Sequence, residues 1–314
     1  MALPVVAYWA YDACPRSVLP SAARQVARGA RLRPEAGGLE KWGAHMVRWI
    51  SALILTLSAA CTSLDTAPAQ LEDLLPWAFA HYESASDGEF AAAIVNLSAA
   101  ATAVSIDNPL RGELHHRLDY PDINYLHLND RNPQNAQGLY LLNTFHCTLT
   151  QLEKVLKFRD QGYLYPDQYN LYQSNFTSSE ADYMARKTSF LYWSTYLSAT
   201  KGLWTMNETL VGALRFIPDQ GATKSPHGAA LIARTYMPEP AHFEDADKLW
   251  LQDYQVEIYY EQEPGRILHA YGMWRQVDLG AFFHSDSDSF VDNVSSALVD
   301  WDKMTESDCA AGKP

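Results

Sequence analysis

The sequence predicts an α+β fold, in which N-terminal helices precede an antiparallel sheet and a long helix closes the chain. Three observations support this prediction. Ala- and Leu-rich segments with helical spacing come first, aromatic and β-branched segments bounded by Gly, Pro and Asn follow, and an amphipathic segment stands near the C-terminus. Another α+β sandwich is the alternative, because the order of elements does not fix how the layers pack.

Residues 1–45 differ in composition from the rest of the chain. They are rich in Arg, Ala, Gly and Pro and have no sustained hydrophobic period. This composition is typical of translated upstream DNA or of a transit peptide. We favour a start site placed too early, because a better targeting segment follows directly.

Residues 46–60 form that targeting segment, with a basic start at Arg48, an apolar run and two alanines before Cys61. The run of about a dozen residues is shorter than the ~20 that a transmembrane helix requires. The pattern resembles the lipobox of bacterial lipoproteins, although Ser58 stands where Leu is commoner. The resemblance implies cleavage before Cys61 and a lipid on its sulfur. Because Thr62 follows, it also implies transfer to the outer membrane in a Gram-negative host.

The net charge of the chain limits which partners are expected, and the cysteine content allows one disulfide. The chain has 24 Lys and Arg against 37 Asp and Glu, a net charge of −13, and loss of residues 1–60 makes it more acidic. Such a charge repels nucleic acid and anionic headgroups, so we expect no nucleic-acid partner and attribute membrane association to the lipid alone. The remaining cysteines, Cys147 and Cys309, could pair in the envelope or stay free, and both alternatives are open.

The first part of the mature chain is expected to be helical. Residues 61–70 are small and polar and are interpreted as a tether. Apolar residues at helical spacing predict helices at 71–79 and 87–101. Residues 107–137 are rich in Pro, Asn, Asp and His, which indicates an irregular connection. Residues 71–137 are thus a helical extension ahead of the sheet.

Residues 138–305 have the pattern of a sheet with helices at its two ends. Thr150 and Glu153 fit a capping box, which predicts a short helix after the first strand. Pro264 and Gly265 suit the middle of a tight turn and predict a hairpin. The expected strands are 139–146, 169–176, 188–199, 209–217, 229–237, 253–261 and 266–279, and an apolar stripe from Phe290 to Trp301 predicts the closing helix before a tail at 306–314.

This order of strand, helix, strand meander and terminal helix resembles the helix-grip fold of the START-like (SRPBCC) superfamily. In that superfamily the sheet curls around the last helix and encloses an apolar cavity. The resemblance implies a curved sheet packed on the C-terminal helix, and a hydrophobic small molecule or lipid in the cavity. The two helices before residue 138 lie outside the superfamily's pattern.

The hairpin supplies the candidate ligand-binding residues. An even register from the turn places Tyr260 opposite His269 and Tyr254 opposite Arg275, with their side chains on one face. A one-residue bulge at the turn would invert this assignment. Protein groups near the sheet edge are an alternative partner for the polar side chains. The candidates are Tyr254, Tyr260, His269, Tyr271 and Arg275.

Motifs for catalysis and for cofactors are missing from the sequence. It has no G-x-S-x-G elbow, no H-E-x-x-H metal motif and no Gly-rich phosphate loop, so we expect no metal and no cofactor. The acidic stretch at 286–288 resembles the start of a calcium loop, but the Gly and Glu that such a loop needs do not follow. His269, Glu257 and Tyr271 are the natural candidates if acid–base chemistry occurs.

Three hypotheses follow from the sequence. The first is a lipid-anchored envelope protein that binds a hydrophobic molecule in a cavity without catalysis. The second is a cavity enzyme of the cyclase or hydrolase type that uses His269 with a carboxylate. The third is a structural envelope lipoprotein whose acidic surface binds another protein. A cavity favours the first, and a perturbed His–carboxylate pair inside it favours the second.

Overall fold

The computed structural model describes residues 67–313 except 129, 167, 202–203, 220–227, 245–247, 280–284 and 286–288. The segment 1–45, the expected signal peptide 46–60, Cys61 and the acidic stretch 286–288 lie outside the described residues. Residues from Ala67 onward belong to one compact unit. Within this part of the chain, no helix combines the length and hydrophobicity that a bilayer crossing needs.

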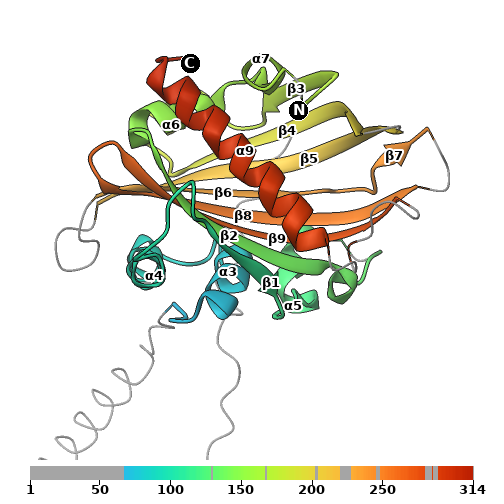
Figure 1. The fold of residues 1–314 in the computed structure, drawn as a ribbon, viewed down its shortest axis with the longest axis horizontal. Coiled ribbons are helices and arrows are strands. Elements are labelled where there is room, and N and C mark those ends of the chain that lie inside the picture. The colour runs from blue at the N-terminus through green and yellow to red at the C-terminus, as the bar shows by residue number, and fades with distance from the viewer. Residues whose placement is uncertain are drawn as a thin grey trace, which may run out of the picture. The chain divides into compact units, whose positions relative to one another are not determined.

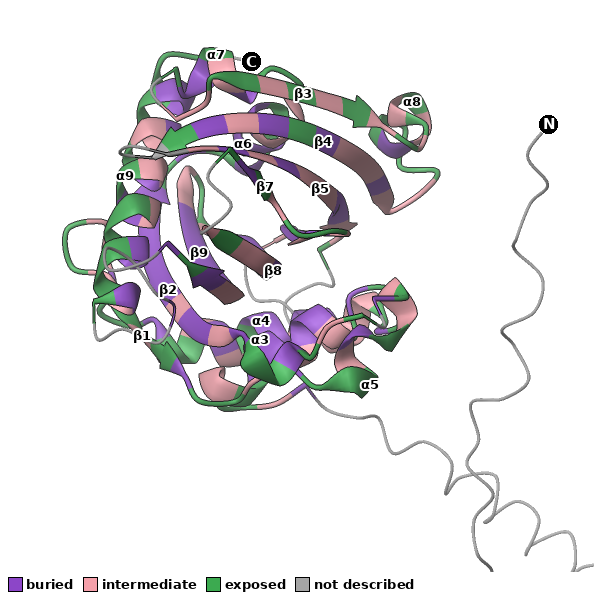
Figure 2. Cartoon of the chain, turned by 90° about the vertical axis from the view of Figure 1, so that its right-hand side faces the viewer, coloured by how far each residue is buried: buried purple, intermediate pink, exposed green. Residues whose placement is uncertain are grey.

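The centre of the fold is a curved antiparallel sheet, whose bending is visible in β2, β3 and β4 (Figure 2). Within the described ranges it has nine strands in the order β1-β2-β9-β8-β6-β5-β4-β3, and β7 pairs with β5. The strands are β1 (Leu110–Leu114), β2 (Gln137–His146), β3 (Leu171–Phe176), β4 (Phe190–Lys201), β5 (Trp204–Ile217), β6 (Ala230–Tyr236), β7 (His242–Phe243), β8 (Leu249–Glu263) and β9 (Arg266–Asp278).

The C-terminal helix α9 (Phe290–Ala310) lies diagonally across the strands (Figure 1). We call the side of the sheet that α9 covers the cavity face, and the opposite side the helical face. The fold is therefore the α+β helix-grip arrangement that the sequence predicts. The other helical segments are α3 (Leu71–Ala80), α4 (Asp87–Ala100), α5 (Tyr120–Ile123), η1 (Asn124–Leu126), η2 (Pro133–Asn135), α6 (Leu149–Lys157), α7 (Gln161–Leu164) and α8 (Glu180–Met184).

The helical face is a filled core. Side chains of α3 and α4 pack on alternate residues of β5, β6, β8 and β9, since successive side chains of a strand point to opposite faces. Phe79 of α3 meets Tyr254 and Trp274 edge-on, at ring-centroid distances of 5.8 and 5.9 Å. Burial of side chains of this size stabilises the fold by about 1.5–3 kcal/mol each.

Two buried arginines tie the helices to this face. Arg215 of β5 donates to the carbonyl oxygens of Tyr82 and Ala85, both at 2.7 Å, and to the Asp87 carboxylate at 2.8 Å. Arg234 of β6 donates to Glu83 at 2.9 Å. Each buried charge therefore has a carboxylate partner, which offsets the cost of removing it from water.

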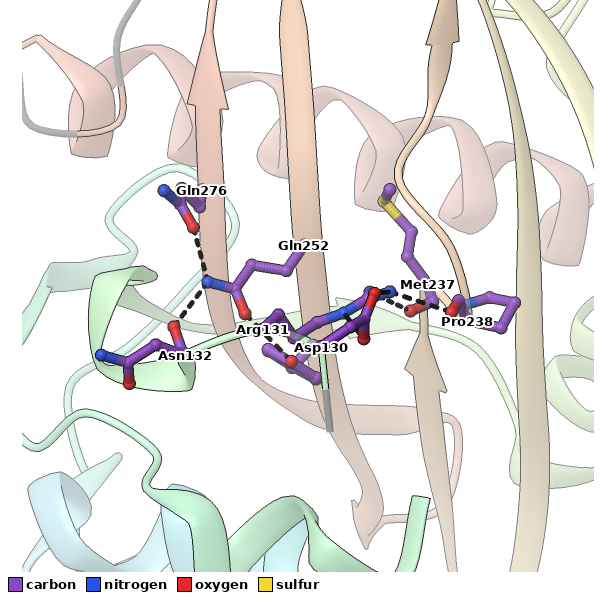
Figure 3. Close-up of polar contacts among 8 residues, drawn as sticks. Asp130, Arg131, Asn132, Met237, Pro238, Gln252 and Gln276 are labelled. Carbon is purple, nitrogen blue, oxygen red and sulfur yellow. Dashed lines mark hydrogen bonds and ion pairs between the residues drawn. The ribbon is translucent and has the colours of Figure 1, made fainter. Parts of the chain in front are cut away.

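Polar contacts also hold the connection before β2 against the sheet (Figure 3). Gln252 of β8 donates to the carbonyl oxygen of Asn132 at 2.8 Å. The guanidinium of Arg131 donates to the carbonyl oxygens of Met237 and Pro238 at 2.9 and 3.0 Å. This connection contains the short helical segments α5, η1 and η2, and its backbone and side chains are tied to the strands.

Two local predictions are wrong. The segment 107–137 was expected to have no strand, yet it contains β1, which is mostly exposed and therefore lacks the apolar alternation of a half-buried strand. The N-cap of helix α6 lies two residues earlier than expected. Its N-cap is Thr148, whose hydroxyl accepts from the Gln151 N–H at 3.2 Å, and not Thr150. Both pairs fit the S/T-x-x-E/Q pattern, so the pattern could not separate them.

Cys147 and Cys309 form a disulfide, with their α-carbons 5.5 Å apart. The bond joins the segment after β2 to the last turn of α9. Helix α9 continues to Ala310, past the end expected at residue 305. The helix that covers the cavity face is thus covalently fixed at its C-terminal end.

Candidate functional site

A cavity of about 630 Å³ lies between the cavity face of the sheet and α9, with α6 and α7 at one side. Its volume is in the range of pockets that hold small molecules. Strands β3, β4, β5, β6, β8 and β9 all contribute to its wall. The aromatic side chains of the wall are Phe158, Tyr165, Tyr172, Phe176, Trp193, Trp250, Tyr259, Tyr271 and Trp301.

The register of the β8–β9 hairpin decides which of its residues face this cavity. Glu263 pairs with Arg266 next to the turn, as an even register requires, but the register shifts between Glu261 and Glu263. Beyond the shift, Tyr259 and not Tyr260 lies opposite His269. The predicted register is therefore wrong beyond this shift. One extra residue in β8 moves every β8 side chain that lies farther from the turn to the opposite face of the sheet.

The shift divides the five predicted ligand-binding residues between the two faces. His269, Tyr271 and Arg275 line the cavity. Tyr254 and Tyr260 are buried on the helical face, in the core with α3 and α4. Their predicted place beside His269 and Arg275 is corrected accordingly.

A polar cluster forms one wall of the cavity. The Nδ1 atom of His269 lies 3.0 and 3.1 Å from the two carboxylate oxygens of Asp302 in α9. Asn143 of β2 donates to the same carboxylate at 2.6 Å. On the other side of the imidazole, Nε2 lies 3.4 Å from Oε2 of Glu257, which also accepts a hydrogen bond from the Tyr259 hydroxyl. Four separate elements thus meet at one buried imidazole.

The electrostatics of this cluster favour a charged imidazole. Burial lowers the pKa of His269, because it disfavours the imidazolium ion. The Asp302 carboxylate raises that pKa by its charge and its hydrogen bond, and Glu257 adds to the rise. The net result is a pKa of about 9 for His269. At neutral pH the imidazole is therefore protonated, and it can donate but not accept a proton.

A second ion pair lies further along the same face. Arg275 donates from Nε to the Asp253 carboxylate at 2.8 Å, and its guanidinium lies 4.2 Å from the ring centre of Trp250. Burial raises the pKa of Asp253, and Arg275 opposes that rise only in part. Because Asp253 neutralises Arg275, this pair leaves no excess charge in the cavity.

Asp302 and Asn143 are cluster residues that the sequence reasoning missed. A signal for Asp302 existed, since it follows Leu298 by four residues and so continues the apolar stripe of the last helix. Glu257 was considered for acid–base work, but on the wrong face of the sheet. Among the described residues, no three His, Cys, Asp or Glu side chains are placed to hold a metal ion.

Comparison with known proteins finds similarity at the level of the fold. No protein-family model matches the chain, and no curated protein matches it. It is similar to human STARD10, with a TM-score of 0.36 and 13% identity over 55% of this chain and 63% of that chain. The chain thus spans slightly less than two thirds of the length of STARD10. It is also similar to the lipid transfer and protein localization domain of human StarD13, with a TM-score of 0.38 and 12% identity over 68% and 95%.

A bacterial structure gives a similar result. The STAR-related lipid transfer protein from Xanthomonas axonopodis has a TM-score of 0.33 and 10% identity over 56% of this chain and 87% of its own. Likeness at this level does not indicate what the present chain binds. The functional argument therefore depends on the cavity and its residues.

Proposed function

We propose that the protein is a lipid-anchored envelope protein that holds a hydrophobic small molecule or lipid in its cavity and does not transform it. The observation that supports this is the cavity of about 630 Å³ between the sheet and α9. Protein interiors are close-packed and rarely leave voids larger than a water molecule. An aromatic-lined space of this size is therefore better explained as a binding site than as a packing defect.

The test is a titration of the full chain with the neutral dye Nile red. The chain carries Cys61→Ser, so that no acyl group competes for the cavity, and is prepared with the Cys147–Cys309 bond formed. We expect saturable binding of one dye per chain and displacement by long-chain hydrocarbons. Binding that does not saturate, or that persists after the cavity is filled by a Trp substitution, would contradict the proposal.

The anchor and the outer-membrane location are proposed from the sequence alone. Intact mass spectrometry of membrane-extracted protein, expressed from Met46 in a bacterial host, tests the anchor. We expect an N-terminus at Cys61 bearing acyl chains, and loss of those chains in Cys61→Ser. A chain that keeps residues before Cys61 would remove the basis for the lipid anchor, and separation of inner and outer membranes tests the location.

The polar cluster favours a second candidate function, a cavity enzyme. A charged His269 held by Asp302 could donate a proton from Nε2, with Glu257 beside it as a base. The test is turnover of p-nitrophenyl esters of increasing chain length. Hydrolysis that is lost in His269→Gln while Nile red still binds would favour the enzyme, and no turnover of any ester would count against a hydrolase.

A further inference from the structure

Glu257 is the most exposed of the three charged groups of the polar cluster that line the cavity. Its side chain is 21% exposed, whereas the side chains of His269 and Asp302 are each 3% exposed. Its contacts to Tyr259 and to His269 are both made by Oε2. The other carboxylate oxygen, Oε1, takes part in neither of these contacts.

The charges of the cluster do not balance. Two carboxylates, Glu257 and Asp302, face one imidazole, and their other polar neighbours, Tyr259 and Asn143, are neutral. With His269 protonated the cluster has one negative charge in excess, and with His269 neutral it would have two. The other two cations among the described residues that line the cavity do not correct this, because Asp253 neutralises Arg275 and Glu180 pairs with Lys157 at 3.4 Å. A buried excess charge is costly, so a cation in the cavity would be stabilised.

Four tyrosines line the same cavity as this carboxylate. They are Tyr165, Tyr172, Tyr259 and Tyr271. Burial is the main cause that raises the pKa of each of these phenols, and the charge of Glu257 adds to the rise in all four. Of the four, Tyr259 is in direct contact with Glu257 through its hydroxyl. Aromatic faces attract cations, most strongly where water is excluded.

We propose that Glu257 and the tyrosines of the cavity wall bind the ammonium group of an apolar organic amine, whose hydrocarbon part fills the rest of the cavity. The ammonium donates to Oε1 of Glu257 and supplies the missing positive charge. A fatty acid would instead place a third carboxylate beside two others. This inference rests on the proposed binding function and specifies the polar end of the ligand.

Four probes with the same dodecyl chain separate charge from hydrogen bonding. Dodecylammonium has both a charge and donors, dodecyltrimethylammonium has the charge alone, dodecanol has a donor alone, and dodecanoate has the opposite charge. Each displaces Nile red from the Cys61→Ser full chain at pH 7, below its critical micelle concentration. We expect dodecylammonium to bind about 10-fold more tightly than dodecanol and dodecanoate to bind most weakly, because the charge-assisted bond and the aromatic faces favour only the cation.

Two variants with the same change of charge locate the effect. Glu257→Gln should reduce the preference for dodecylammonium over dodecanol to about 2-fold or less, since a neutral amide lacks the charge-assisted bond. Glu263→Gln removes one charge at the exposed end of the same strand and should leave the preference intact. If Glu257→Gln fails to fold, Tyr172→Leu on the edge strand β3 replaces it, and should weaken both ammonium probes but not dodecanol.

The outcomes distinguish this inference from the proposed function. If dodecanoate binds as tightly as dodecylammonium, or if the amine preference survives in Glu257→Gln, the ammonium site is wrong although the cavity still binds ligands. If neither Nile red nor any probe binds saturably, the binding function itself is wrong, and the ammonium site falls with it.

Discussion

The buried arginines on the helical face of the sheet are paired with carboxylates, whereas the polar cluster on the cavity face has an unbalanced charge. On the helical face, Arg215 and Arg234 each meet a carboxylate, and Arg215 also meets two carbonyl oxygens. On the cavity face, Glu257 and Asp302 share a single imidazole and remain one positive charge short. The helical face is filled by α3 and α4, whereas the cavity face leaves about 630 Å³ under α9.

Buried charges can therefore serve two purposes, to stabilise the fold or to bind a ligand. Matched charges on the helical face fix where the helices dock, and nothing is left over for a ligand. The unmatched cluster on the cavity face lies beside the space that a ligand would fill. Substitutions on the helical face should therefore act on stability alone, and those that change the cavity wall should act on binding, with a further effect on stability where they remove a member of the polar cluster.

The largest effect is expected for Arg215→Met, on the helical face. The substitution leaves two buried carbonyl oxygens and the Asp87 carboxylate without their donor. Breaking a buried pair in this way costs about 3–5 kcal/mol. Urea unfolding measures the loss, and Nile red affinity of the folded fraction should stay within about 2-fold of the parent. A large loss of affinity with unchanged stability would contradict the separation of the two faces.

The Cys147→Ser, Cys309→Ser double variant should give the next largest effect. The disulfide closes a long loop, with 162 residues of sequence separation, and its removal frees the unfolded chain. The free energy of unfolding should fall by about 2–4 kcal/mol. Urea unfolding under oxidising conditions measures the change, and the parent under reducing conditions should match the variant. Equal stability of variant and parent would mean that the other contacts of α9 suffice.

The cluster itself predicts a dependence of stability on pH. The pKa of His269 is raised from 6.5 to about 9, so its contribution to stability is complete below pH 6.5 and is lost as the pH rises through about 9. Relative to His269→Gln, the parent should lose on the order of 2–3 kcal/mol of unfolding free energy between these limits. Urea unfolding at several pH values from 6 to 10 measures the difference. Parallel curves for parent and variant would show that the cluster does not hold a charged imidazole.

The comparison of faces also explains what the sequence could predict. The main strands and helices follow from apolar periodicity, and the hairpin follows from the turn residues Pro264 and Gly265, because secondary structure depends on neighbours in the chain. The face that each hairpin residue occupies depends on a single register shift between Glu261 and Glu263, which no local pattern indicates. That one residue moved Tyr254 away from the predicted site and brought Glu257 into it.

Prediction of the site also requires knowledge of which helices and strands contact one another in the fold. His269 was a candidate from its own strand, but its partner Asp302 comes from a helix 33 residues later. Helical spacing after Leu298 placed Asp302 on the buried stripe, yet only the packing of α9 on β9 makes the two side chains partners. Catalytic and binding groups converge in space, so the sequence could name His269 and Glu257 but not Asp302 and Asn143.

The smallest expected effect on stability, and the most direct test of the cavity face, is Thr235→Trp. Thr235 lies on β6 and lines the cavity, so an indole ring there occupies space that a ligand needs. Because the ring enters a void and not a filled core, the unfolding free energy should change by less than about 1 kcal/mol, in contrast to overpacking. Nile red affinity should fall at least about 10-fold, which corresponds to 1.4 kcal/mol of binding free energy.

Gln173→Trp is the matched control for this test. Gln173 is exposed on β3 and does not line the cavity, whereas its neighbours Tyr172 and Ser174 do. The same indole added there should leave dye affinity unchanged. If Thr235→Trp binds the dye as tightly as Gln173→Trp, then the dye occupies another surface. The hollow under α9 would then be only a gap in packing, and the two faces of the sheet would differ in density but not in role.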